Sequence, residues 1–94
     1  LNLSSFRELA FAIKNTDKNS NVAIRVEFTN SFKERSEVYV KHIPAKWQEF
    51  RLSFFDFKNI TDWSEMQSIT FTVEEWNAQK DRGILYIDNV RFLK

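Results

Sequence analysis

The closing stretch of the chain, Gly83 to Lys94, constrains the fold most, because it predicts one long, largely buried strand around which the rest packs. It begins with the only glycine of the chain and is rich in β-branched and aromatic residues. Its apolar positions are Leu85, Ile87, Val90 and Phe92. Strict alternation puts the first two on one face and the last two on the other. One extra residue at Asp88–Asn89 brings all four to one face, so we expect a β-bulge there, with Asp88 turned aside.

Alternation of apolar and polar residues predicts further strands. The clearest is Val22 to Thr29, whose apolar residues fall on one face and whose polar residues fall mostly on the other. Three more runs have the same character: Glu37 to His42, Trp47 to Phe54 and Gln67 to Glu74. Polar, turn-rich segments separate these runs.

The opening stretch supports two interpretations. Ser5 followed by Glu8 resembles a capping box, which favours a helix. Leu9, Phe11 and Ile13 alternate with smaller or polar residues, which favours a strand. Periodicity alone leaves both open.

Strands at even spacing with hairpin-length loops predict an all-β fold, an antiparallel two-sheet β-sandwich, in a single domain spanning residues 1–94. A composition of 43% hydrophobic and 16% aromatic residues indicates an ordered core. The predicted strands number about six, whereas a two-sheet jelly roll has about eight. We therefore expect a jelly roll that lacks one or two N-terminal strands.

Several function classes are disfavoured by composition. A net charge of +1 gives no reason to expect a nucleic-acid partner, and no run is long enough to span a membrane. A single histidine and no cysteine exclude histidine or thiolate metal clusters and catalytic triads, and a single glycine excludes a phosphate-cradling loop. The adjacent Glu74 and Glu75 point to opposite faces of a strand, unlike a glycosidase acid/base pair. We expect no enzymatic activity.

Three ordered segments resemble a known family. They are L-S-S-F-R-E-L-A-F-A-I-K near the start, K-W-Q-E-F-R-L-S-F-F-D-F-K-N-I-T-D-W-S-E-M in the middle and G-I-L-Y-I-D-N-V-R-F at the end. Together they resemble the C-terminal two-thirds of a galactose-binding-like β-jelly-roll domain. The resemblance is to carbohydrate-binding modules of bacterial glycoside hydrolases and to the related complex I intermediate-associated protein type. It implies a strand for the opening stretch and packing roles for Trp47 and Trp63.

Sugar binding needs aromatic faces for the apolar side of a pyranose ring and polar side chains for its hydroxyls. The candidate carbohydrate-binding residues are Arg25, Glu27, Tyr39, Arg51, Trp76 and Tyr86. Parity places Arg25, Glu27, Arg51 and Thr72 on one sheet surface. The competing interpretation is a solvated sheet face with cross-strand ion pairs.

The resemblance also implies a structural Ca²⁺ ion at Asp88, where members of this superfamily often place a carboxylate. Calcium takes six to eight oxygen ligands, so the other ligands would have to come from the absent N-terminal strands. The simpler interpretation is that Asp88 favours the bulge and bonds nearby backbone.

These observations predict a non-catalytic module that targets an attached enzyme to a polysaccharide, in an extracellular or periplasmic bacterial setting. The alternative is a structural or protein-interaction sandwich without a sugar site. Because a missing edge strand exposes backbone groups and core, we also expect pairing with the missing N-terminal strands, another copy or a parent chain.

Overall fold

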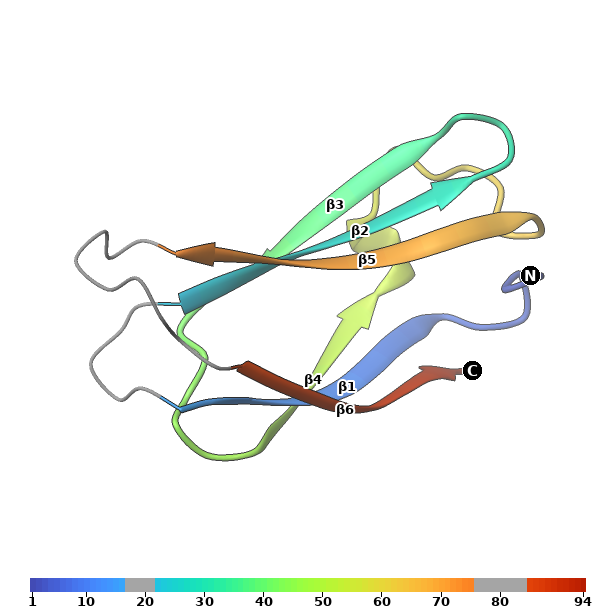
Figure 1. Ribbon diagram of the computed structural model, residues 1–94. Helices are drawn as coiled ribbons and strands as arrows, with labels where there is room; N and C mark the ends of the chain where they lie inside the picture. The colour runs from blue at the N-terminus through green and yellow to red at the C-terminus, as the bar shows by residue number, and fades with distance from the viewer. Residues whose placement is uncertain (17–21, 76–84) are drawn as a thin grey trace.

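The computed structural model describes residues 1–16, 22–75 and 85–94, which form two antiparallel sheets packed face to face (Figure 1). The elements are β1 (Glu8–Asn15), β2 (Val22–Asn30), β3 (Arg35–Val40), β4 (Gln48–Ser53), the 3₁₀ helix η1 (Phe54–Asp56), β5 (Met66–Glu75) and β6 (Leu85–Leu93). This confirms the predicted all-β antiparallel sandwich. Within these three segments, no helix is long and apolar enough to cross a membrane.

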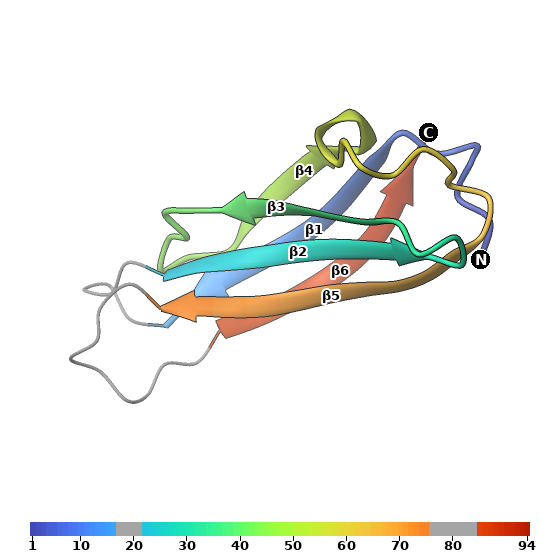
Figure 2. The ribbon, with the colours of Figure 1, turned by 90° about the horizontal axis from the view of Figure 1, so that it is seen from above.

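Each sheet has three strands. The β1 sheet has the order β4-β1-β6, and the β2 sheet has the order β3-β2-β5. Strands β5 and β6 therefore lie along one side of the sandwich and β3 and β4 along the other, as Figure 2 shows from above. The buried side chains of the central strands β1 and β2 pack against each other between the two sheets.

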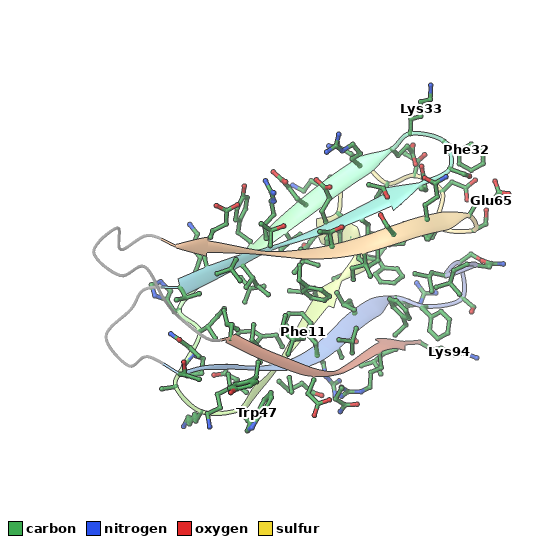
Figure 3. All side chains as sticks on the ribbon, in the orientation of Figure 1. Phe11, Phe32, Lys33, Trp47, Glu65 and Lys94 are labelled. Atoms are coloured by element: carbon green, nitrogen blue, oxygen red, sulfur yellow. The ribbon has the colours of Figure 1, made fainter. Side chains whose placement is uncertain are left out.

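The core lies between the sheets and is built from alternate residues of the two central strands. Leu9, Phe11 and Ile13 of β1 are fully buried, so the opening stretch is a strand and not a helix. The predicted inward residues of β2 are buried as well: Val22, Ile24, Val26 and Phe28. The Phe11 ring lies between the layers (Figure 3), 6.1 Å from the Phe50 ring and 5.4 Å from the Phe71 ring.

The closing strand is not central, and that prediction was wrong. Among the described strands, β6 pairs with β1 alone, and Leu85 and Ile87 are only partly buried. The physical reason lies in the outward side chains, because β1 presents the small Ala10 and Ala12 between two neighbours. Strand β6 presents large and polar residues instead, which suit an edge.

The predicted bulge is confirmed, one residue further along than Asp88. The register between β1 and β6 passes from the pair Ala12–Asp88 to the pair Ala10–Arg91. The two residues between Asp88 and Arg91 therefore oppose Phe11 alone, and the first of them, Asn89, has φ 55°. The expected shared face is only partly realised: Leu85, Ile87 and Phe92 pack against the core, whereas Val90 is 46% exposed.

Aromatic rings close the end of the sandwich where η1 crosses from one sheet to the other. Phe28 packs edge-on against the rings of Phe54, Phe57 and Trp63, at centroid distances of 5.8, 4.8 and 5.0 Å. The Trp63 ring is stacked on Phe54 at 3.9 Å. The predicted packing role of Trp63 is therefore confirmed.

At the same end, Asn30 and Glu34 connect the β2–β3 turn to the segment before β5 through hydrogen bonds. The Glu34 carboxylate accepts hydrogen bonds from the Thr61 hydroxyl (2.5 Å), the Thr61 N–H (2.9 Å) and the Asn30 amide (2.7 Å). These bonds, with that of the Thr61 hydroxyl the strongest, lower the pKa of Glu34 to about 2. The Asn30 side chain is 2% exposed and also donates to the Asp62 carbonyl at 2.9 Å.

Candidate functional site

The outer face of the β1 sheet has small residues along its middle strand. Ala10 and Ala12 point outward from β1, so the side chains of β4 and β6 rise on either side of a low strip. In the register, Ala12 lies between Glu49 of β4 and Asp88 of β6. Two carboxylates thus flank the strip at the same level.

Two guanidinium groups flank the strip at the level of Ala10, which lies between Arg51 and Arg91. The Arg91 side chain reaches across β1 to the Glu49 carboxylate, and it also donates to the Asn89 carbonyl at 3.0 Å. Arg51 pairs with Glu49 from the same strand, at 3.4 Å. The hydrogen bond from Arg91 holds the pKa of the Glu49 carboxyl below its ordinary value, so this carboxylate stays charged.

An exposed aromatic pair lies on either side of Lys14, the next outward residue of β1 after Ala12. Lys14 of β1 is opposite Tyr86 of β6, and continuation of the β1–β4 register by one residue brings Trp47 to its other side. The rings of Trp47 and Tyr86 are 50% and 49% exposed, with centroids 6.4 Å apart and planes at 45°. Figure 3 shows Trp47 on the outer side of the β1 sheet, away from the core.

The prediction that Trp47 is a packing residue was therefore wrong. Trp47 has the same parity as Arg51, which was predicted to lie on an outer sheet surface, and this signal was present in the sequence. The position just before β4 permits a large exposed ring, because no third layer covers this face in the described part of the chain.

The structure divides the candidate sugar-binding residues between two faces. Arg51 and Tyr86 lie on the outer face of the β1 sheet, whereas Arg25, Glu27 and Tyr39 lie on the outer face of the β2 sheet. The expected common surface is therefore wrong for Arg51, because β4 belongs to the opposite layer from β2. The remaining candidate, Trp76, lies outside the described residues.

Ion pairs cover much of the outer face of the β2 sheet. Arg25 lies 3.7 Å from a Glu37 carboxylate oxygen and 3.8 Å from one of Glu74, and Glu27 lies 3.7 Å from Arg35. This agrees with the competing interpretation of a solvated face with cross-strand ion pairs. Tyr39 is 45% exposed on this face.

Asp88, the predicted calcium ligand, is an exposed residue beside the bulge of β6. In the three described segments, no group of three or more His, Cys, Asp or Glu residues could hold a metal. Asp88 is exposed, and its carboxylate accepts the N–H of Asn89 at 2.7 Å, as expected for a residue that stabilises the bulge. One carboxylate supplies too few of the six to eight oxygens that calcium takes.

A hollow of about 350 Å³ lies at the end of the sandwich beside η1. Its walls include the aromatic rings of Phe54, Phe55 and Trp63, and the side chains of Arg7 and Lys58 lie at its border. Phe55 is 82% exposed, whereas Phe54 is 7% exposed and belongs to the core. This hollow is a concave alternative to the outer face of the β1 sheet.

Comparison with protein-family models, with curated proteins and with solved structures finds no significant match to this chain. The resemblance to galactose-binding-like modules therefore stays a prediction, while the two-sheet antiparallel fold rests on the structure itself.

Proposed function

We propose that this chain is a non-catalytic carbohydrate-binding module and that it binds sugar on the outer face of the β1 sheet. The observation that supports this most is the exposed pair of Trp47 and Tyr86. Exposing large aromatic rings to water is unfavourable in free energy, and such rings next to charged side chains are typical of recognition surfaces.

The groups beside the outward positions Ala10, Ala12 and Lys14 of β1 suit both the apolar face and the hydroxyls of a sugar ring. An aromatic ring stacks on the apolar face of a pyranose, and carboxylate and guanidinium groups bond its hydroxyls. Residues two apart on a strand lie about 7 Å apart. A pyranose stacked on Tyr86 or Trp47 therefore turns its hydroxyls toward Asp88 and Glu49, one level along.

The ion pairs among Glu49, Arg51 and Arg91 support this role because they fix the polar groups before ligand arrives. A side chain that is already held loses less conformational entropy on binding. In this proposal the module keeps an attached enzyme near its polysaccharide outside the bacterial cell, and the chain itself performs no chemistry. The proposal does not require a calcium ion.

The test is affinity electrophoresis on a panel of soluble β-glucans, xylans and mannans, with and without a chelator. We expect retardation on at least one glycan, unchanged by the chelator. Trp47→Ala and Tyr86→Ala should each weaken binding about 30-fold, the effect of losing a central contact of about 2 kcal/mol.

Two control variants remove exposed aromatic rings from the competing locations. Tyr39→Ala changes the outer face of the β2 sheet, and Phe55→Ala changes the border of the end hollow. Both should bind as the unmodified chain does. If either one abolishes retardation while Trp47→Ala does not, the proposed face is wrong. No retardation on any glycan would favour the alternative, an interaction domain without a sugar site.

A further inference from the structure

The end hollow beside η1 has a floor that belongs to the core. Phe54, Phe57 and Ile60 line it and are 7%, 1% and 6% exposed. Phe55, which is 82% exposed, forms part of the wall on the same side. The volume of about 350 Å³ lies at the lower end of the range for small-molecule sites, which are mostly apolar with a few polar groups. The hollow therefore suits a small ring compound.

The walls are held in place by contacts within the protein. The Trp63 ring is stacked on Phe54 with planes at 6°, and it meets the Phe57 ring edge-on at 6.2 Å. The Phe54 N–H donates to the Arg7 carbonyl at 2.9 Å, which fixes η1 against the segment before β1. The Ile60 N–H donates to the Phe57 carbonyl at 3.1 Å. A site with fixed walls loses little conformational entropy when a ligand binds.

Aromatic rings make up most of the apolar wall. Five of the described lining residues are aromatic and one is aliphatic: Phe6, Phe54, Phe55, Phe57 and Trp63, against Ile60. Aromatic rings bind another ring offset or edge-on, and such contacts stabilise beyond the burial of area alone. The wall therefore favours a ligand with a flat, aromatic body.

The charges at the border of the hollow have one sign. Among the described residues that line it, Arg7 and Lys58 are basic and none is acidic. Both residues are exposed, and neither forms an ion pair with a carboxylate in the described part of the chain. On the outer sheet faces, by contrast, Arg25, Arg51 and Arg91 all have acidic partners. Two unpaired cations beside an aromatic wall are complementary to an anion, and a guanidinium binds a carboxylate through two parallel hydrogen bonds.

We propose that the end hollow binds a small aromatic carboxylate, with its ring against Phe55 and Trp63 and its carboxylate toward Arg7 and Lys58. This site is distinct from the outer face of the β1 sheet, since neither Trp47 nor Tyr86 lines the hollow. It does not depend on the proposed sugar binding, and either can fail without the other.

Titration of the chain with naphthoate, followed by amide chemical shifts in NMR, tests the proposal. The control ligand is naphthamide, which has the same rings without the charge. We expect naphthoate to bind with a dissociation constant of about 0.1–1 mM. It should shift the amides of Arg7 and of residues 54–63. Naphthamide should bind about fivefold more weakly, and added salt should reduce the difference between the two ligands.

Substitutions separate the two parts of the site. Arg7→Gln with Lys58→Gln should weaken naphthoate binding about fivefold, to the affinity of naphthamide, and leave naphthamide binding unchanged. Phe55→Ala should weaken the binding of both ligands about threefold or more. The matched control, Lys33→Gln with Lys94→Gln, removes the same number of charges outside the hollow (Figure 3) and should leave both affinities unchanged.

The substituted residues Arg7, Lys58 and Phe55 are exposed, so the variants should fold as the unmodified chain does. Equal affinities for naphthoate and naphthamide would overturn the proposal. Shifts that map to Trp47 and Tyr86 instead, or an unchanged naphthoate affinity in the Arg7 and Lys58 double variant, would do the same. Absence of shifts at any soluble concentration of naphthoate would also overturn it.

Discussion

Replacing Phe28 by alanine should destabilise the protein more than a typical core substitution. The side chain is 1% exposed, and its ring makes edge-on contacts with three other rings from η1 and the segment that follows. The Phe28→Ala change therefore removes a ring that three neighbours surround. Those neighbours belong to a connection that spans the two sheets, and they cannot collapse fully into the cavity.

The expected loss is about 3–5 kcal/mol in the free energy of unfolding, as for buried phenylalanines replaced by alanine. A chain of this length has a total of about 5–14 kcal/mol. Its entropy of unfolding is about 0.2 kcal/mol per kelvin, so the loss lowers the midpoint temperature by about 15–25 °C. The variant should fold, with a large part of its stability gone.

Thermal and urea unfolding followed by circular dichroism measure this loss. The matched control is Phe32→Ala in the turn after β2, where the ring is 54% exposed and points away from the core (Figure 3). That change should stay within about 0.5 kcal/mol. A loss below about 1.5 kcal/mol for Phe28→Ala, or equal effects of the two variants, would refute the view that the end cluster is rigid.

Two further predictions concern single residues of the fold. Glu34 has a folded-state pKa of about 2, below its ordinary value of 4.5, so its stabilising contribution is complete above about pH 4.5 and is lost as the pH falls toward 2. Glu34→Gln should therefore flatten the decline of stability over this interval in acid titrations of urea unfolding, and an unchanged pH profile would contradict the assignment. Asn89 has φ 55°, so Asn89→Val should cost about 1–2 kcal/mol in thermal unfolding. Asn89→Gly should be close to neutral, and equal effects of the two substitutions would exclude backbone strain as the cause.

The sequence was sufficient to predict the strands, because each central strand has one face against the core. Val22 to Thr29 alternates without interruption, and β2 has that parity in the structure. The bulge before Val90 was predictable for the same reason, since burial of both Ile87 and Phe92 requires one extra residue between them. Periodicity detects a buried face whether the strand lies at the centre or at the edge of its sheet.

Strand position was not predictable in the same way. The apolar residues of the closing stretch are as dense as those of β1, yet β6 lies at an edge. What distinguishes the two is the outward face, where β1 has alanines and β6 has Tyr86, Asp88 and Arg91. For the same reason sequence parity alone put Arg51 with Arg25, because parity says which residues point outward but not from which sheet.

The alanines of β1 connect the fold with the proposed site. Alanine is a poor strand former, and a central strand normally favours β-branched residues. Ala10 is fully buried although it faces outward, and the side chain of its neighbour Arg91 crosses β1 to reach Glu49. A larger residue at Ala10 or Ala12 would block this crossing and fill the strip between β4 and β6. The low strip and the carboxylate held by Arg91 therefore both depend on small side chains in the middle strand.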